Sequence, residues 1–162
     1  HFSDKLLMAQ AKETYVVDDA TINAVMLALH DEGVKPDEVT QTKVLDVTKN
    51  ARMRSKVYNH CAQITYKITG KPPPRLTSEQ EEVAKLIFAA IQAPFEKHKP
   101  PDRKNFLSYL YCLYRILELM GCDELLPSIS LMTGPGKVAA QDAIMKKIYE
   151  DLEIQWPGDL ES

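Results

Sequence analysis

Hydrophobic residues recur at helical spacing along most of this chain. Within residues 19–31 they follow the i, i+3, i+4, i+7 pattern that one face of a helix produces: Ile22, Val25, Met26 and Leu29. Asp18 is a suitable N-cap for this helix, because its carboxylate can accept hydrogen bonds from the free amides of the first turn. Gly33 can end the helix, since glycine readily adopts the left-handed conformation found at helix C-termini.

The same spacing predicts further helices and no strand. Their expected ranges are 2–12, a helix opening at Pro36, 55–69, a helix that begins after Pro74, 105–120 and 137–153, with a short helical turn within 123–132. The segment 105–120 is apolar on all sides, which predicts a central helix with neighbours around it. Together these elements predict an all-α fold, as a single globular domain of six or seven helices.

Prolines mark the clearest break in this pattern. The run Lys71-Pro72-Pro73-Pro74 cannot continue a helix, because proline lacks an amide proton and favours extended geometry. The Pro72–Pro74 segment is either a linker between two subdomains, 1–70 and 75–162, or a stiff loop packed on the surface of one domain. Farther along, Pro94 is expected to kink or end its helix.

Composition places the chain among ordinary globular proteins, with 44% hydrophobic and 27% charged residues. No apolar run approaches the length of a membrane-spanning helix, so no membrane partner is expected. The first residue is His1 rather than Met, which suggests a fragment or a processed product.

Three cysteines, Cys61, Cys112 and Cys122, stand far apart in the sequence. An odd number without close spacing favours free thiols in a reducing compartment. An all-cysteine zinc site needs four thiolates, so no metal or other cofactor is expected within this chain. A mixed site that includes His60 or His98 is the alternative.

Net charge is −3, but its distribution is uneven. The stretch from Lys49 to Arg75 holds seven bases and no acid, whereas the stretch from Glu13 to Asp46 holds eight acids and two bases. Such asymmetry can focus a positive field over one face. The first group of candidate nucleic-acid or partner-binding residues therefore comprises Arg52, Arg54 and Lys56. A solvated surface without a partner is the alternative for this group.

A second basic group follows Pro94 and comprises Lys97, Lys99, Arg103 and Lys104. Arg103 and Lys104 are predicted in the first turn of the helix that follows, where positive charge opposes the helix dipole. Arg103 either pairs with an acid or helix-end carbonyls, or else contacts phosphate or an acidic partner. If both groups serve one nucleic-acid track, they should lie on the same side of the molecule.

Catalysis finds little support in the sequence. The chain has no GxxxxGK[ST], GxGxxG, GxSxG or HExxH motif. The segment from Thr133 to Lys137 resembles a phosphate loop, but Pro135 removes an amide donor and no serine or threonine follows the lysine. We therefore expect no enzyme activity, no catalytic residue and no small-molecule substrate.

The segment 95–109, Phe-Glu-Lys-His-Lys-Pro-Pro-Asp-Arg-Lys-Asn-Phe-Leu-Ser-Tyr, resembles the most diagnostic block of the viral late transcription factor 3-like family of poxviruses and other nucleocytoplasmic large DNA viruses. Supporting matches occur in order along nearly the whole chain, at His1-Phe2, 10–13, 58–60, 70–74 and 141–144. The chain departs from the family at Met145, where tryptophan is expected, and in the Gly/Pro-rich loop 130–136.

This resemblance implies a helical C-terminal domain of a late-gene transcription factor. Its expected partners are the virus-encoded RNA polymerase, other late transcription factors and duplex DNA. It also implies zinc-binding cysteines in a region that precedes this one, and an intracellular location in a viral factory of the host cytoplasm. The alternative is a helical protein-binding scaffold with no affinity for nucleic acid.

Overall fold

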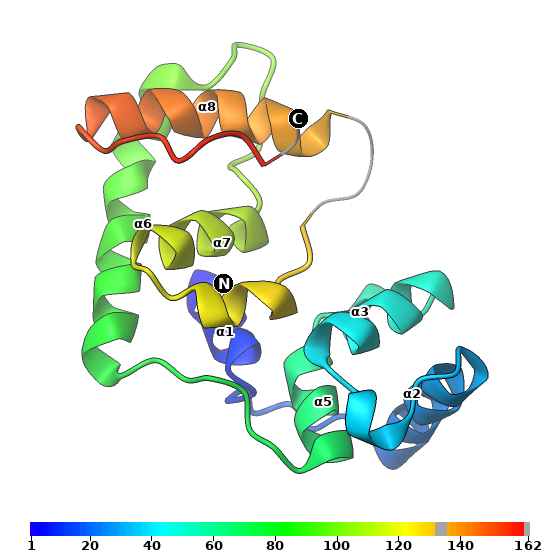
Figure 1. The fold of residues 1–162 in the computed structure, drawn as a ribbon. Coiled ribbons are helices and arrows are strands. Elements are labelled where there is room, and N and C mark those ends of the chain that lie inside the picture. Colours follow the sequence, from blue (N-terminus) through cyan, green and yellow to red (C-terminus); the bar gives the residue numbers. More distant parts are fainter. Residues whose placement is uncertain (132–135, 161–162) are drawn as a thin grey trace.

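The computed structural model describes residues 1–131 and 136–160, and in that part of the chain every regular element is a helix (Figure 1). The α-helices are α1 (Phe2–Ala9), α2 (Asp19–Asp31), α3 (Gln41–Asn50), α4 (Ser55–Tyr58), α5 (Cys61–Thr69), α6 (Ser78–His98), α7 (Tyr109–Leu119) and α8 (Lys137–Asp151). Two short 3-10 helices, η1 (Pro36–Glu38) and η2 (Asp123–Ser128), join them. The all-α prediction is confirmed. Of the Gly/Pro-rich loop 130–136, residues 132–135 lie outside the described residues.

The helix count exceeds the expected six or seven because the helix predicted over 55–69 divides into α4 and α5. His60 leaves the helical conformation, at φ −105 and ψ 25, and its amide bonds to the Val57 carbonyl only three residues back. Val57 and Cys61 still pack into one hydrophobic cluster. The apolar stripe predicted across 55–69 therefore faces a core, although the helix that carries it is interrupted.

Helix ends depend on residues that the sequence does not mark. Gly33 ends α2 at φ 76, as predicted. Three other helix ends, after α1, α3 and α8, place a non-glycine residue at positive φ: Ala11, Arg52 and Glu153. In each, the next amide bonds to a carbonyl five residues back, as Met53 does to Thr48 at 2.9 Å. The helices predicted over 2–12 and 137–153 accordingly end earlier, at Ala9 and Asp151.

The prediction that Arg103 and Lys104 occupy the first turn of a helix is wrong. Helix α7 begins at Tyr109, because the Ser108 hydroxyl caps it by accepting from the Tyr111 amide at 3.4 Å. Both bases therefore lie in the loop between α6 and α7, and the helix-dipole argument does not apply to them. Pro94 does not end its helix either, since α6 continues to His98.

Two hydrophobic clusters organise the molecule. The larger core is built from α1, α6, α7, η2 and α8 and includes Leu6, Phe95, Leu113 and Ile148. The smaller core is built from α2, α3 and α5 and includes Val25, Val44 and Ile64. Figure 1 shows α2, α3 and α5 in one lobe beside α1, α6, α7 and α8. Although α1 is first in the sequence, its buried face packs in the larger core.

The Pro72–Pro74 segment runs along the bottom of Figure 1 from α5 to α6, and Pro73 is buried. It connects the lobe of the smaller core to α6, which belongs to the larger core. Contacts between α1 and α5 and between α3 and η2 also connect the two parts. The division into subdomains 1–70 and 75–162 stays a prediction.

A buried ionic network lies at the centre of the larger core. The Arg115 side chain is 1% exposed and donates to Asp142 at 2.8 Å, to Glu118 at 2.8 Å and to the Gly158 carbonyl at 2.8 Å. Asp142 also accepts from the Tyr111 hydroxyl and from the Leu160 amide, the latter at 2.7 Å. The buried polar groups of Arg115, Tyr111 and Asp142 thus all have partners. The bonds to Gly158 and Leu160 hold the C-terminal tail alongside α8 (Figure 1).

Burial, and next the hydrogen bond to Asp142, raise the pKa of Tyr111 well above its usual range. The phenol therefore stays protonated at any physiological pH and remains a hydrogen-bond donor to the carboxylate.

Among the described residues, no helix combines the length and the apolar character that a membrane crossing needs.

Candidate nucleic-acid interface

The first basic group surrounds α4 and is open to solvent. Arg52, Arg54 and Lys56 are all exposed. Within the described residues, neither Arg52 nor Arg54 has a hydrogen bond or ion pair from its side chain. Lys56 places its ammonium 4.8 Å from the ring centroid of Tyr15, a cation–π distance. Two guanidinium groups and one ammonium group are therefore available here for phosphate or acidic side chains.

The second basic group, around the end of α6, is mostly engaged within the molecule. Lys97 pairs with Asp151 at 3.3 Å, and Lys99 pairs with Glu96 at 2.7 Å. Arg103 donates to the carbonyls of Asn105 at 3.1 Å and Phe106 at 3.4 Å. These carbonyls belong to the loop before α7, so Arg103 shapes that loop, and no acid pairs with it among the described residues.

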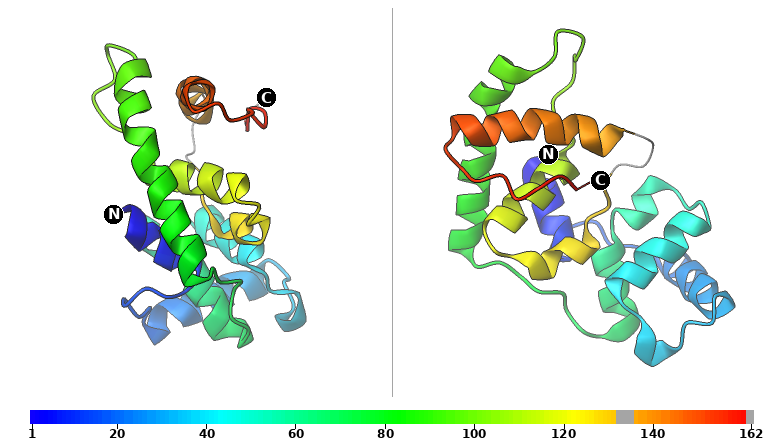
Figure 2. Two further views of the ribbon diagram at one scale, coloured as in Figure 1. Left: turned by 90° about the vertical axis from the view of Figure 1, so that its left-hand side faces the viewer. Right: turned by 45° about the horizontal axis from the view of Figure 1, so that its top comes forward.

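Lys104 is exposed and has no ion pair within the part of the chain that the structure describes. The two basic groups are not brought together. The first lies beside α3, and the second lies at the end of α6 and in the loop that follows it. The two regions stay apart in every view of Figures 1 and 2. The fold therefore does not present one continuous basic surface that includes both groups. Whether either group contacts nucleic acid stays a prediction.

The loop between α1 and α2, residues 10–18, is held firmly on α5, which sequence reasoning missed. The Gln63 side chain accepts from the Val17 amide at 2.6 Å and donates to the Tyr15 carbonyl at 2.7 Å. The Lys67 ammonium donates to the Val17 carbonyl at 3.0 Å. These contacts leave Tyr15 41% exposed and Val16 68% exposed. The three polar contacts therefore hold Tyr15 and Val16 at the surface in a defined position.

A buried carboxylate lies beneath this loop. Glu13 Oε2 is 2.8 Å from His60 Nδ1, and both side chains are 6% exposed. The His60 ring also packs against Tyr15, with the centroids 4.8 Å apart. The other carboxylate oxygen, Glu13 Oε1, is buried without a hydrogen-bond partner. A buried acceptor without a donor costs free energy, of order 1–3 kcal/mol, so this oxygen invites a functional explanation.

A pocket of about 510 Å³ opens at this loop, within the size range of ligand sites. Its wall is formed by Ala11, Glu13, Tyr15, Val16, Gln63, Tyr66 and Lys67. Tyr66 is 37% exposed, and within the described residues its ring makes no aromatic or cation–π contact. The pocket therefore combines tyrosine faces, one carboxylate and one ammonium group.

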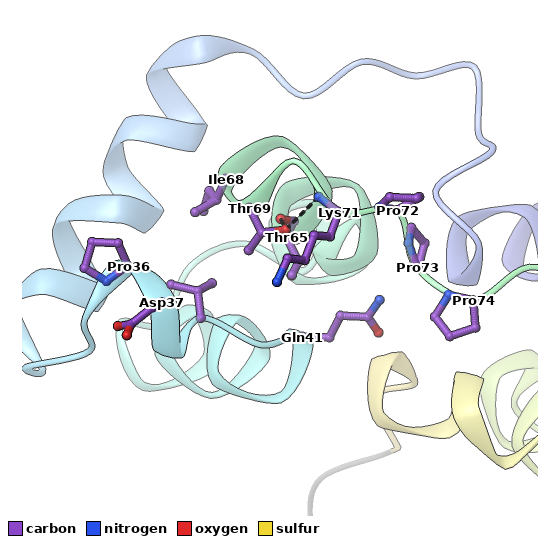
Figure 3. Close-up of a pocket in the computed structure, with 11 residues that line it drawn as sticks. Pro36, Asp37, Gln41, Thr65, Ile68, Thr69, Lys71, Pro72, Pro73 and Pro74 are labelled. Carbon is purple, nitrogen blue, oxygen red and sulfur yellow. Dashed lines mark hydrogen bonds between the residues drawn. The ribbon is translucent and has the colours of Figure 1, made fainter.

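A second hollow, of about 570 Å³, lies between α5 and the η1–α3 segment (Figure 3). Prolines form much of its wall: Pro36, Pro72, Pro73 and Pro74. Lys71 extends over it, and Asp37 lies on the opposite side. One acid and one base leave this groove without net charge, so it offers less to a polyanion than the α4 surface does.

The cysteines remain thiols. Burial raises the pKa of Cys61 and of Cys112 to about 12, so both are protonated at neutral pH. Among the described residues, no group of three or more His, Cys, Asp or Glu side chains is arranged to hold a metal ion. The mixed Cys–His zinc site thus has no geometric support there.

Comparison with known proteins gives consistent matches over nearly the whole chain. A family model described as "Poxvirus Late Transcription Factor VLTF3 like" matches residues 1–156. A protein of Paramecium bursaria Chlorella virus 1 named "Putative transcription factor" is 39% identical over 157 residues, which is 96% of this chain and 43% of that protein. A protein of Acanthamoeba polyphaga mimivirus with the same descriptive name is 30% identical over 150 residues, which is 93% of this chain and 35% of that protein.

The chain therefore spans less than half the length of these two relatives. No solved structure matches it.

Proposed function

This chain belongs to the poxvirus late transcription factor VLTF3-like family, as its resemblance over residues 95–109 predicted, and we propose that it is a non-enzymatic module of a viral late-gene transcription factor. In this proposal it acts inside the infected cell together with the virus-encoded RNA polymerase and other late transcription factors. It contacts duplex DNA through the basic surface at α4.

The main support for the proposed DNA contact is that the guanidinium groups of the first basic group are exposed and unpaired within the described residues. Arg52 and Arg54 are exposed and make no side-chain ion pair within the described residues. Such residues can neutralise phosphates without first breaking an internal contact. Lys97, Lys99 and Arg103 would each have to give up an internal partner, and the whole second group lies apart from α4, so the proposed surface is limited to the first group.

The experiment is the salt dependence of binding to duplex DNA. Phosphate contacts release counterions, so the logarithm of the affinity should fall linearly with the logarithm of salt concentration. Replacing Arg52 and Arg54 together by alanine should weaken binding and reduce that slope by about 0.9 for each phosphate that is no longer neutralised. Stability should change little, because substitutions of exposed side chains usually alter it by less than about 0.5 kcal/mol.

A matched control removes the same charge elsewhere. Lys146 and Lys147 are exposed on α8, and the double Lys146→Ala, Lys147→Ala variant should keep the wild-type slope. Equal reductions of affinity in the two variants would point to general electrostatics and refute a specific α4 surface.

The second candidate function is a scaffold that binds proteins alone. It draws on the proline-walled groove between α5 and η1, which carries no net charge. Capture of the viral polymerase by a chain that shows no salt-dependent affinity for duplex DNA would establish this alternative. Lys71→Glu, at the groove, should then weaken the capture, while the Arg52 and Arg54 substitutions should not.

A further inference from the structure

The pocket beside the loop of residues 10–18 carries features that a duplex-binding surface does not need. It is lined by Tyr15 and Tyr66, which are partly exposed, and by the carboxylate of Glu13, which is buried. Duplex DNA is contacted mainly through phosphates and groove edges. Aromatic faces are instead the platforms on which unpaired bases stack.

Glu13 is the second, independent indication of a ligand. Its Oε2 is engaged by His60 at 2.8 Å, while Oε1 has no donor among the described residues. Because Oε1 is itself closed to solvent, a donor in the pocket that Glu13 lines would satisfy that oxygen after the carboxylate turns toward the pocket. Bases with an exocyclic amino group supply such a donor, and a carboxylate accepting from the cytosine amino group is a known recognition contact.

The charges around the pocket select against a cationic ligand. Lys67 lines the wall, and the Lys56 ammonium lies 4.8 Å from the ring centroid of Tyr15. Both positive charges would repel an arginine side chain of a partner protein that entered the pocket. A neutral base attached to an anionic backbone would place its phosphates near them.

We propose that this pocket receives one unstacked base of a single-stranded nucleic acid. The base stacks on Tyr66, with Tyr15 as another part of the pocket wall, and its amino group donates to Glu13 Oε1. Lys56 and Lys67 attract the adjoining phosphates. The proposal rests on the proposed function only in taking nucleic acid as the partner, because duplex binding at Arg52 and Arg54 and strand binding at Tyr66 are measured separately.

The test uses the chain with short single-stranded oligomers of deoxycytidine and of thymidine of equal length. Both bases are single-ring pyrimidines, but cytosine carries an amino group where thymine has a carbonyl, and thymine also carries a C5 methyl group. The wild-type chain should bind the deoxycytidine oligomer more tightly. Tyr66→Ala should weaken binding to both oligomers by about 5- to 100-fold, the range for loss of one base–aromatic stack. Tyr66→Phe, which keeps the stacking face, should restore binding.

Tyr109→Ala is the matched control, because Tyr109 has the same 37% exposure as Tyr66 but lies on α7. It should leave strand binding unchanged. Glu13→Gln presents an amide group in place of the free oxygen, so it should abolish or reverse the preference for deoxycytidine. Circular dichroism establishes that each variant retains its helices, and the Tyr66 variants test the pocket even if Glu13→Gln fails to fold.

Several results would overturn the proposal. These are no strand binding by the wild-type chain at low salt, equal affinity for the two oligomers, or equal weakening in the Tyr66→Ala and Tyr109→Ala variants. An arginine-rich peptide that binds the wild-type chain but not Tyr66→Ala, with strand binding intact in that variant, would assign the pocket to a protein partner instead. Loss of duplex binding in the Arg52 and Arg54 variant, with strand binding intact, would support a strand site that is independent of the duplex surface.

Discussion

The larger core and the smaller core each have a buried carboxylate, and the two carboxylates are satisfied to different degrees. In the larger core, Asp142 is bonded by Arg115, by the Tyr111 hydroxyl and by the Leu160 amide. At the edge of the smaller core, Glu13 is bonded by His60 through one oxygen only. A complete network rigidifies a fold, whereas an incomplete one leaves capacity for a ligand.

The surfaces over the two cores also differ in how many of their polar and charged side chains have partners within the molecule. The lobe of the smaller core exposes Tyr15 and Tyr66 and presents Arg52 and Arg54 without internal partners among the described residues. Over the larger core, Lys97, Lys99 and Arg103 are held by acids or carbonyls. The comparison suggests that the larger core maintains the structure and that the smaller lobe provides the binding surfaces.

The largest expected effect tests the structural role of the ionic network. Arg115→Met leaves Asp142 as an uncompensated charge, because that side chain is only 2% exposed. We expect a loss of about 3–5 kcal/mol in the free energy of unfolding, measured by chemical denaturation. Adding Asp142→Leu should recover part of it, since two apolar side chains can replace a buried ion pair. A loss below about 1 kcal/mol would show that water reaches the network.

The second prediction concerns the clamp that holds the loop of residues 10–18. Gln63→Ala removes two hydrogen bonds and leaves the buried Val17 amide without its acceptor. A destabilisation of about 1–3 kcal/mol should follow, together with weaker strand binding, because Tyr15 is no longer fixed. Gln92→Ala is the control, since the exposed Gln92 side chain bonds only within its own helix. Unchanged strand binding in Gln63→Ala would show that the position of this loop does not contribute to binding at the pocket.

A smaller effect, of opposite sign, concerns Arg52. This residue has φ 53, a left-handed conformation that costs an L-residue about 1–2 kcal/mol. Arg52→Gly should relieve that cost and stabilise the chain by about 0.5–1 kcal/mol, after the entropy that glycine adds to the unfolded state. Arg52→Ala keeps the same backbone and should give no gain. A stabilised Arg52→Gly chain with weaker duplex binding would show that the arginine is retained for its charge.

The smallest effect depends on pH and concerns the ends of α6 and α8. The hydrogen bond from His98, followed by that from Lys97, lowers the pKa of Asp151 below its ordinary value of 3.8. Because the pKa is depressed in the folded state, the stability from these contacts is present above pH 3.8 and is lost as the pH falls through the folded pKa. Asp151→Asn should therefore be slightly less stable than the wild type near neutral pH and equal to it in strong acid, by thermal denaturation. A difference that persists in strong acid would contradict this account.

Local patterns in the sequence were sufficient for much of the helical framework. The residues that cap helix starts act within one turn, so Asp18 could be recognised before α2, and it accepts from the Thr21 amide as expected. Thr77 caps α6 in the same local way, by accepting from the Gln80 amide. Gly33 ends α2 for an equally local reason. Where a helix ends at Ala11, Arg52 or Glu153, the residue type carries no such signal, because these residue types rarely adopt the positive φ that they have here.

The candidate site depended on contacts that no local pattern contains. The sequence by itself established an all-α chain with a basic stretch from Lys49 to Arg75, because charge and hydrophobic spacing can be read from neighbours. Only the tertiary structure paired Glu13 with His60, 47 residues away, and bound Tyr15 to Gln63 across 48 residues. It also decided which bases are free, since an ion pair such as Lys97 with Asp151 requires α6 and α8 to meet in space.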